Sequence, residues 1–160
     1  MYSKENALTT AYNDVVLFND VAGAEPNLDT MRNKTLRVLE EVKETLEAID
    51  KRDDKEILDG VVDVLYTAFG LIKPMEQMGF DVMGALTAVC QNNASKLIPA
   101  DNVDEIINTV KMYKKAGVET VVSVHEPSGR CAVKNKSEGK VLKPFSYKSV
   151  NLSTYLPRKD

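Results

Sequence analysis

Residues 54–73 read DKEILDGVVDVLYTAFGLIK, and this stretch decides the fold class. On a helix of 100° per residue its apolar side chains cover well over half of the circumference, which predicts a helix buried on most sides. The narrow strip left over holds Asp59, Asp63 and Tyr66. Aspartates beside so much apolar surface are costly unless a positive charge meets them. The apolar residues of the stretch are Ile57, Leu58, Val61, Val62, Val64, Leu65, Ala68, Phe69 and Ile72.

Helical periodicity predicts two helices before this stretch and one after it. The first covers residues 3–22, and the second runs from Leu28 to Asp50 after a break that contains Gly23 and Pro26. Pro74 is expected to end or kink the third helix. A fourth helix is predicted over residues 80–97, closed by Pro99. The apolar stripe of the second helix is Leu28, Met31, Thr35, Leu39, Val42, Leu46 and Ile49. Short connectors between these helices favour antiparallel packing in a four-helix bundle.

The remaining chain differs in kind. An amphipathic helix is predicted over residues 101–116, with Asp101 or Asn102 as its N-terminal cap and Gly117 just after its C-terminal end. A short hairpin is predicted from the β-branched run 118–124, a turn at 127–129 and a returning strand at 131–133. An extended tail is predicted over residues 136–160. We therefore predict one all-α domain over residues 1–160, with a helical core in 1–98 and the helix, hairpin and tail in 99–160.

Composition and charge restrict the class of protein. No apolar run approaches the roughly 18 residues that span a bilayer, and the N-terminal stretch lacks the apolar segment of a secretory signal. Cys90 and Cys131 are expected to be reduced thiols of a cytoplasmic protein. A net charge of −3 gives no electrostatic case for nucleic-acid binding. Positive charge gathers in residues 130–148, as Arg130, Lys134, Lys136, Lys140, Lys143 and Lys148.

Two acidic pairs stand on the second and third helices. Glu41 and Glu44 are three residues apart and Asp59 and Asp63 are four apart, so each pair projects from one side of its helix. Carboxylates are the ligands that Mg²⁺ or Mn²⁺ prefers, and no His or Cys nearby favours zinc. These acids predict a metal site, and the basic tail would face a polyphosphate held by the metal. The alternative is a solvated acidic face with a solvated tail.

Several motifs together resemble the all-α nucleoside triphosphate pyrophosphohydrolase superfamily, and most closely its phage and bacterial MazG-like branch. They are Glu40-Glu41-x-x-Glu44, Asp59-Gly-Val-Val-Asp63, Asn93-Ala-Ser-Lys96, Gly139-Lys-Val-Leu-Lys143, and Phe18-Asn19 with Asn in place of a family His. The resemblance runs from about Val15 to Leu152. It implies metal-dependent cleavage of a nucleoside triphosphate between the α- and β-phosphates.

The resemblance also implies roles for particular acids. Glu41, Glu44 and Asp63 are implied metal ligands for Mg²⁺ or Mn²⁺. Most relatives place a Glu where this chain has Gly60, so Asp59 is expected to supply the fourth carboxylate. Glu40, beside Glu41 in the catalytic pair, is expected to orient or deprotonate the attacking water.

Substrate contacts are expected from Asn93, Lys96, Lys143 and Tyr147, with Asn19 as a base contact. Some phage-type relatives remove dGTP, so dGTP or GTP is the expected substrate by analogy. The resemblance further implies a homodimer or homotetramer, and we expect neither membrane nor nucleic acid as a partner. The alternatives are a dUTPase or a phosphoribosyl-ATP pyrophosphohydrolase of the same fold, or a non-catalytic helical oligomerisation module.

Overall fold

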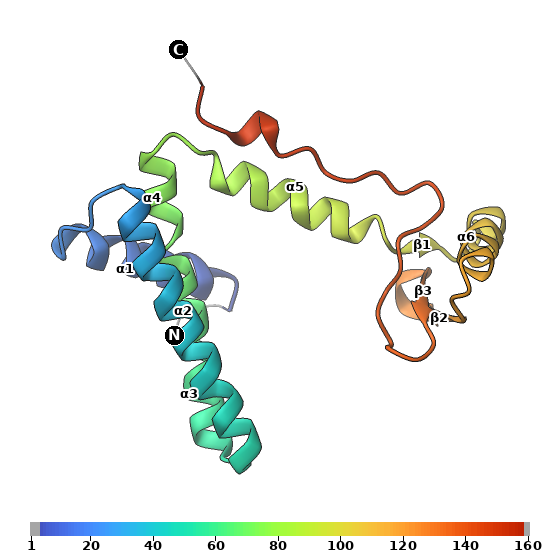
Figure 1. Ribbon diagram of the computed structural model, residues 1–160, viewed down its shortest axis with the longest axis horizontal. Helices are drawn as coiled ribbons and strands as arrows, with labels where there is room; N and C mark the ends of the chain where they lie inside the picture. Colours follow the sequence, from blue (N-terminus) through green and yellow to red (C-terminus); the bar gives the residue numbers. More distant parts are fainter. Residues whose placement is uncertain (1–3, 159–160) are drawn as a thin grey trace. The chain divides into compact units, whose positions relative to one another are not determined.

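The computed structural model describes residues 4–158 (Figure 1). Ser3, the predicted start of the first helix, and the last two residues of the predicted tail lie outside the described residues. The helices are α1 (Lys4–Val21), α2 (Leu28–Lys51), α3 (Asp54–Phe69), α4 (Ile72–Gln77), α5 (Val82–Ala94) and α6 (Val103–Lys115). The strands are β1 (Ile98–Pro99), β2 (Thr120–His125) and β3 (Arg130–Asn135), and two 3₁₀ turns are η1 (Glu126–Ser128) and η2 (Ser153–Tyr155).

The chain forms two compact units. Unit one comprises the residues up to Val82 and those from Tyr155 onward, and unit two comprises Met83–Thr154. Unit one contains α1 to α4, whereas unit two contains nearly all of α5, together with α6 and the sheet. The predicted fold class, helical with a small β addition, is confirmed. A single functional domain over residues 1–160 stays a prediction. Within residues 4–158 no helix is long and apolar enough to cross a membrane.

A tight connection makes α2 and α3 antiparallel neighbours, which run side by side in Figure 1. Asn27 caps α2 by accepting from the backbone N–H of Thr30 at 2.8 Å. The helix ends at Arg52, which adopts the left-handed conformation with φ of 55°. Asp53 then caps α3 by accepting from the next two free backbone N–H groups, at 3.1 and 3.2 Å. The chain therefore reverses within two residues, and α2 and α3 pack along their length.

The prediction of one helix over residues 54–73 is wrong in its last part. The third helix ends at Phe69, and Pro74 lies inside the separate short helix α4. Proline has no N–H for the carbonyl four residues earlier, and its ring crowds that carbonyl, which here belongs to Gly70. The break therefore falls at Gly70 and Leu71, and Pro74 takes a first-turn position where no such bond is needed.

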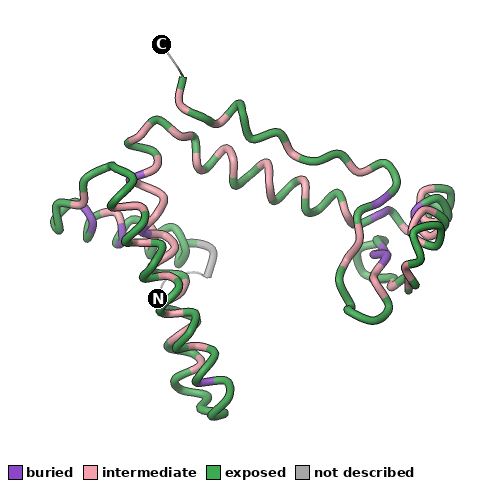
Figure 2. The backbone as a smooth tube through the Cα atoms, in the orientation of Figure 1, coloured by how far each residue is buried: buried purple, intermediate pink, exposed green. Residues whose placement is uncertain are grey.

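The buried face of α2 is not the apolar stripe that periodicity predicts. Within that stripe only Met31 is half-buried, and the other residues are exposed (Figure 2). Leu39, for example, is 47% exposed and Leu46 is 57% exposed. On α3, Leu58 and Val62 are likewise exposed, so burial on most sides is wrong for the single chain. The covered positions of α2 are Thr30, Met31, Lys34, Val38, Glu41, Thr45 and Ala48.

Unit two has its own small core. Strand β1 joins the predicted hairpin to make a three-stranded antiparallel sheet in the order β1-β3-β2, with Ile98 opposite Cys131. The sequence did not predict β1, because a two-residue strand has no periodicity to detect. The predicted helix over 80–97 is shorter, as α5 ends at Ala94 so that the chain can turn into β1. The buried core is Ile98, Cys131 and Val133, with Ile106, Val110 and Leu142 packed against it.

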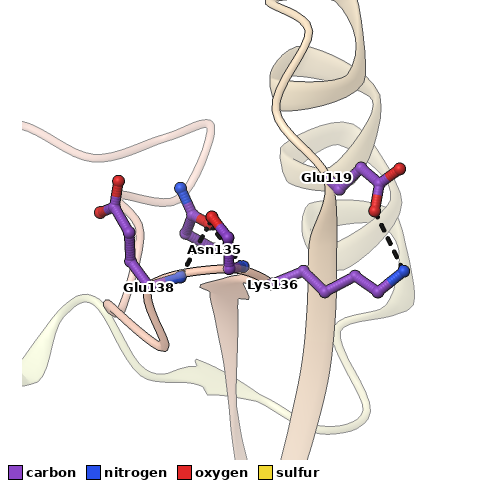
Figure 3. Close-up of polar contacts among 5 residues, drawn as sticks. Glu119, Asn135, Lys136 and Glu138 are labelled. Carbon is purple, nitrogen blue, oxygen red and sulfur yellow. Dashed lines mark hydrogen bonds and ion pairs between the residues drawn. The ribbon is translucent and has the colours of Figure 1, made fainter.

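A polar turn connects β3 to the tail. The side-chain oxygen of Asn135 accepts from the backbone N–H groups of Ser137 and Glu138 at 2.9 and 3.3 Å. Lys136 forms an ion pair with Glu119 at 3.0 Å, just before β2 begins (Figure 3). The turn returns the chain to β3, where the N–H of Leu142 donates to the carbonyl of Val133 at 2.8 Å.

Candidate active site between α2 and α3

The helices α2 and α3 approach each other closely at Gly60. A Cβ atom at this position would lie 2.5 Å from Thr45 Oγ1 and 3.2 Å from Thr45 Cα, so the contact leaves no room for a side chain. The Thr45 hydroxyl donates to the backbone carbonyl of Glu41 at 2.7 Å. Gly60 therefore lets the two helices meet one turn away from the acidic residues.

Glu41 and Asp63 occupy this contact between α2 and α3, and both are half-buried. Burial raises the pKa of Glu41 first, and the negative charges of Glu44, Asp63 and Glu40 raise it further. Arg37 alone acts in the opposite direction. The positive charge near Glu41 therefore does not balance the negative charge around it. The structure brings Glu41 together with three further carboxylates.

Two of the predicted acids have different surroundings. Asp59 is exposed, and it is not among the charges that raise the pKa of Glu41 within the described residues. Glu40 forms an ion pair with Arg37 at 2.6 Å on the exposed side of α2. The acids of residues 4–158 do not already form a group of three arranged to hold a metal ion.

The donor set nevertheless fits a hard divalent cation. Glu41, Glu44 and Asp63 offer carboxylate oxygens only, the ligands that Mg²⁺ and Mn²⁺ take. Their mutual repulsion at Glu41 is the kind of imbalance that a cation removes. These three residues could hold the metal, with Asp59 as a more distant member of the set.

Asn19 belongs to the same unit as the acids. It lies on α1 with only 6% of its surface exposed, and its side-chain oxygen accepts from Lys34 Nζ at 2.6 Å. Sequence reasoning missed Lys34. The available signal was its spacing, because Lys34 and Glu41 are seven residues apart and so share one face of α2.

The other predicted substrate residues belong to unit two, where they form two pairs. Lys96 Nζ donates to the side-chain oxygen of Asn93 at 2.6 Å. Lys143 Nζ lies 4.9 Å from the centre of the Tyr147 ring, in cation–π range. The Tyr147 hydroxyl also donates to the side-chain oxygen of Asn92, whose amide nitrogen donates to the carbonyl of Lys148 at 2.6 Å.

The tail therefore packs along α5 and is not a free arm in its middle part. Backbone N–H groups of Phe145 and Ser146 donate to the side chains of Thr109 and Glu105 at 2.9 and 2.8 Å, which fixes the same segment to α6. Asn92, next to the predicted Asn93, is the residue that anchors it on α5.

Comparison with known families adds the decisive observation. Residues 29–99 match the model of the MazG nucleotide pyrophosphohydrolase domain. This segment is similar to a MazG domain. The match covers α2 to α5 and β1, and so includes both acidic motifs, whereas Asn19, Lys143 and Tyr147 lie outside it. This match supports the predicted enzyme class, a nucleoside triphosphate pyrophosphohydrolase. No curated protein and no solved structure matches the chain.

Proposed function

We propose that the α2–α3 contact hydrolyses a nucleoside or deoxynucleoside triphosphate, first of all dGTP or GTP, to the monophosphate and pyrophosphate with a divalent metal. The observation that carries the proposal is the position of Glu41 and Asp63. Both are half-buried near the close contact of α2 and α3, and the charge of Asp63 raises the pKa of Glu41. Burying two like charges is unfavourable unless the site serves a cation.

Glu41, Glu44 and Asp63 would bind Mg²⁺ or Mn²⁺, and Asp59 would be the fourth ligand by analogy with the family. When bound, the metal neutralises phosphate charge and lowers the pKa of a coordinated water. Glu40 lies beside this set, and its ion pair with Arg37 at 2.6 Å holds the carboxylate in place. Glu40 would orient the attacking water, and Glu40 or Glu41 would accept its proton.

The reaction exchanges one phosphorus–oxygen bond for another. The water oxygen forms a bond to the α-phosphorus while the bond from that phosphorus to the α–β bridging oxygen breaks. The bridging oxygen leaves with the bonding electrons as part of pyrophosphate. Negative charge then grows on the leaving group, and positively charged donors near it favour the reaction.

Asn93, Lys96, Lys143 and Tyr147 would supply those donors. The Asn93–Lys96 hydrogen bond and the position of Lys143 over the Tyr147 ring support this role, because each keeps an ammonium group in a defined place. Asn19, at the opposite end of the chain, would contact the base. The same contacts that order the tail would then order its ligand-binding groups.

We further propose a homodimer or homotetramer in the cytoplasm, with the nucleotide as ligand and neither nucleic acid nor membrane as partner. The support is an extensive apolar surface on the helices, which a monomer would leave in water. Cys90 and Cys131 are both free, which suits a reducing compartment. Exposed large apolar residues of α2 and α3 are Leu28, Leu36, Leu39, Val42, Leu46, Ile49, Leu58, Val61, Val62 and Leu65.

Pyrophosphate release from the common nucleoside and deoxynucleoside triphosphates, with and without Mg²⁺ or Mn²⁺, tests the proposal. We expect metal-dependent release, fastest with dGTP or GTP. Turnover confined to dUTP would make the protein a dUTPase instead. Turnover of phosphoribosyl-ATP alone would assign it to that branch of the fold, and the absence of any turnover would favour an oligomerisation module.

A further inference from the structure

A pocket of about 180 Å³ lies in unit one among α1, α2 and α3, beyond the acidic residues. Phe18 and Tyr66 form one wall, with their rings edge to face and the ring centres 6.4 Å apart. Asn19 and Lys34 supply polar groups. Pockets with aromatic walls and a few polar groups are typical small-molecule sites.

The amide of Asn19 has one atom without a partner. An ammonium group only donates, so the hydrogen bond from Lys34 Nζ at 2.6 Å fixes the amide with its oxygen toward Lys34. Its nitrogen then has no hydrogen-bond partner among the described residues, although it is fully buried. Since a buried amide N–H is rarely left unpaired, an acceptor is expected in the pocket.

Lys34 also has unused donors. It is half-buried, burial lowers the pKa of its ammonium group, and within the described residues no acid forms an ion pair with it. Gly70 leaves space beside both groups, because a Cβ there would lie 3.7 Å from Lys34 Nζ and 3.8 Å from Asn19 Nδ2. The pocket thus presents an unpaired amide N–H of Asn19 beside an ammonium group that has further N–H donors besides the one bonded to Asn19.

The pocket stands in a definite relation to the acids. Lys34 precedes Glu41 by seven residues on α2, and Gly70, the residue that caps the end of α3, follows Asp63 by seven, so each separation is about 10 Å along the helix axis. Because the helices are antiparallel, the pocket lies further along the same contact. A nucleotide with its phosphates at the acids would extend its base toward the pocket.

We propose that Asn19 and Lys34 form a donor pair that selects nucleobases with an oxo group, at C6 of a purine or C4 of a pyrimidine, over those with an amino group. The inference rests on the proposed function of the α2–α3 contact. An oxo oxygen accepts from both donors, whereas the amino group of adenine or cytosine would bring a third donor to them. Phe18 and Tyr66 would contact the flat base.

Matched substrates test the proposal, because ITP and ATP differ in the oxo or amino group at C6, and UTP and CTP in that at C4. For the wild-type protein with saturating Mg²⁺ we expect kcat/KM for ITP to exceed that for ATP by about tenfold or more, and UTP to exceed CTP likewise. Asn19→Asp replaces the unpaired donor by an acceptor and should lower both ratios by about tenfold. Asn33→Asp makes the same change at an exposed position of α2 and should leave them unaltered.

Lys34 provides a second, independent comparison. Lys34→Met removes its donors and should lower the ratios, whereas Lys34→Arg keeps positive donors and should retain most of the preference. This comparison decides the matter if Asn19→Asp does not fold by circular dichroism. Equal kcat/KM for ITP and ATP would overturn the proposed donor pair, and so would kcat/KM ratios that no variant at Asn19 or Lys34 changes. Neither result would contradict the proposed hydrolase function. Inhibition by inorganic phosphate is measured in parallel. If Lys34→Met abolishes that inhibition but leaves the kcat/KM ratios unchanged, the pocket binds phosphate and the proposed donor pair is overturned as well. No turnover of any nucleotide would contradict the proposed function itself.

Discussion

Gly60 and Thr45 lie so close that a Cβ atom on Gly60 would be 2.5 Å from Thr45 Oγ1. This contact sets the spacing of α2 and α3 one turn from Glu41 and Asp63. A side chain at position 60 has no room at the present spacing of the two helices.

Gly60→Ala should therefore destabilise the protein. Alanine gains about 1 kcal/mol of helix propensity over glycine, but an overpacked contact costs about 1–3 kcal/mol, so we expect a net loss of up to about 2 kcal/mol in the free energy of unfolding. Urea unfolding measures it. In a Thr45→Ala background the same change should cost less, because the nearest side-chain atom is gone. A more stable Gly60→Ala protein would show that the helices do not meet there.

Glu41→Gln should stabilise the metal-free protein. The substitution removes a carboxylate that burial and three neighbouring acids disfavour, so in EDTA the melting temperature should rise by a few degrees. In excess Mn²⁺ the wild-type protein should gain stability by ligand binding and the variant should not. Glu47→Gln, which changes an exposed acid of α2, is the matched control and should respond to Mn²⁺ as the wild type does. Equal Mn²⁺ stabilisation of Glu41→Gln would remove Glu41 from the ligand set.

Leu46→Lys should shift the protein toward monomer. Leu46 is 57% exposed within one chain, and a charge placed in an apolar interface weakens association. Light scattering at tens of micromolar protein should give a smaller mass for this variant than for the wild type. Asn33→Lys adds the same charge at an exposed polar position and should keep the wild-type mass. A wild-type monomer under these conditions would contradict the proposed assembly.

Lys143→Ala should raise KM for the nucleotide about tenfold, because the lysine would contact phosphate. The melting temperature should change little, because Lys143 is exposed and its contact with the Tyr147 ring is screened by solvent. Steady-state kinetics measures the effect. Lys115→Ala, at the exposed end of α6, is the control and should leave KM unchanged. Truncation after Asn135 is less informative, since the tail also stabilises unit two through Leu142. An unaltered KM in Lys143→Ala would restrict the tail to that structural role.

Sequence patterns predicted the helices well because caps and breakers act locally. The Asn102 cap and the left-handed Gly117 were both predictable from residue type. The end of α3 was not placed correctly, because Pro74 acts on a carbonyl four residues earlier. Strand β1 could not be predicted from sequence patterns, since its pairing with β3 depends on tertiary contacts.

The acidic residues were predictable as a set, but their surroundings were not. Spacing placed Glu41 with Glu44 and Asp63 with Asp59, yet burial on α2 follows Lys34, Glu41 and Thr45 and not the apolar stripe. Periodicity finds apolar faces whichever partner covers them. It could not reveal that the covered face of α2 mixes polar and apolar side chains, and it therefore missed Lys34.

The most direct test of the account compares Asp63→Asn with Asp50→Asn, two neutralised aspartates of the helix pair. Pyrophosphate release from dGTP with Mg²⁺ is the measurement, and circular dichroism checks the fold. Removing a metal ligand should lower kcat/KM by about 100-fold or more, whereas the exposed Asp50 should tolerate the change. Full activity in a folded Asp63→Asn protein would contradict the assignment of catalysis to the α2–α3 contact.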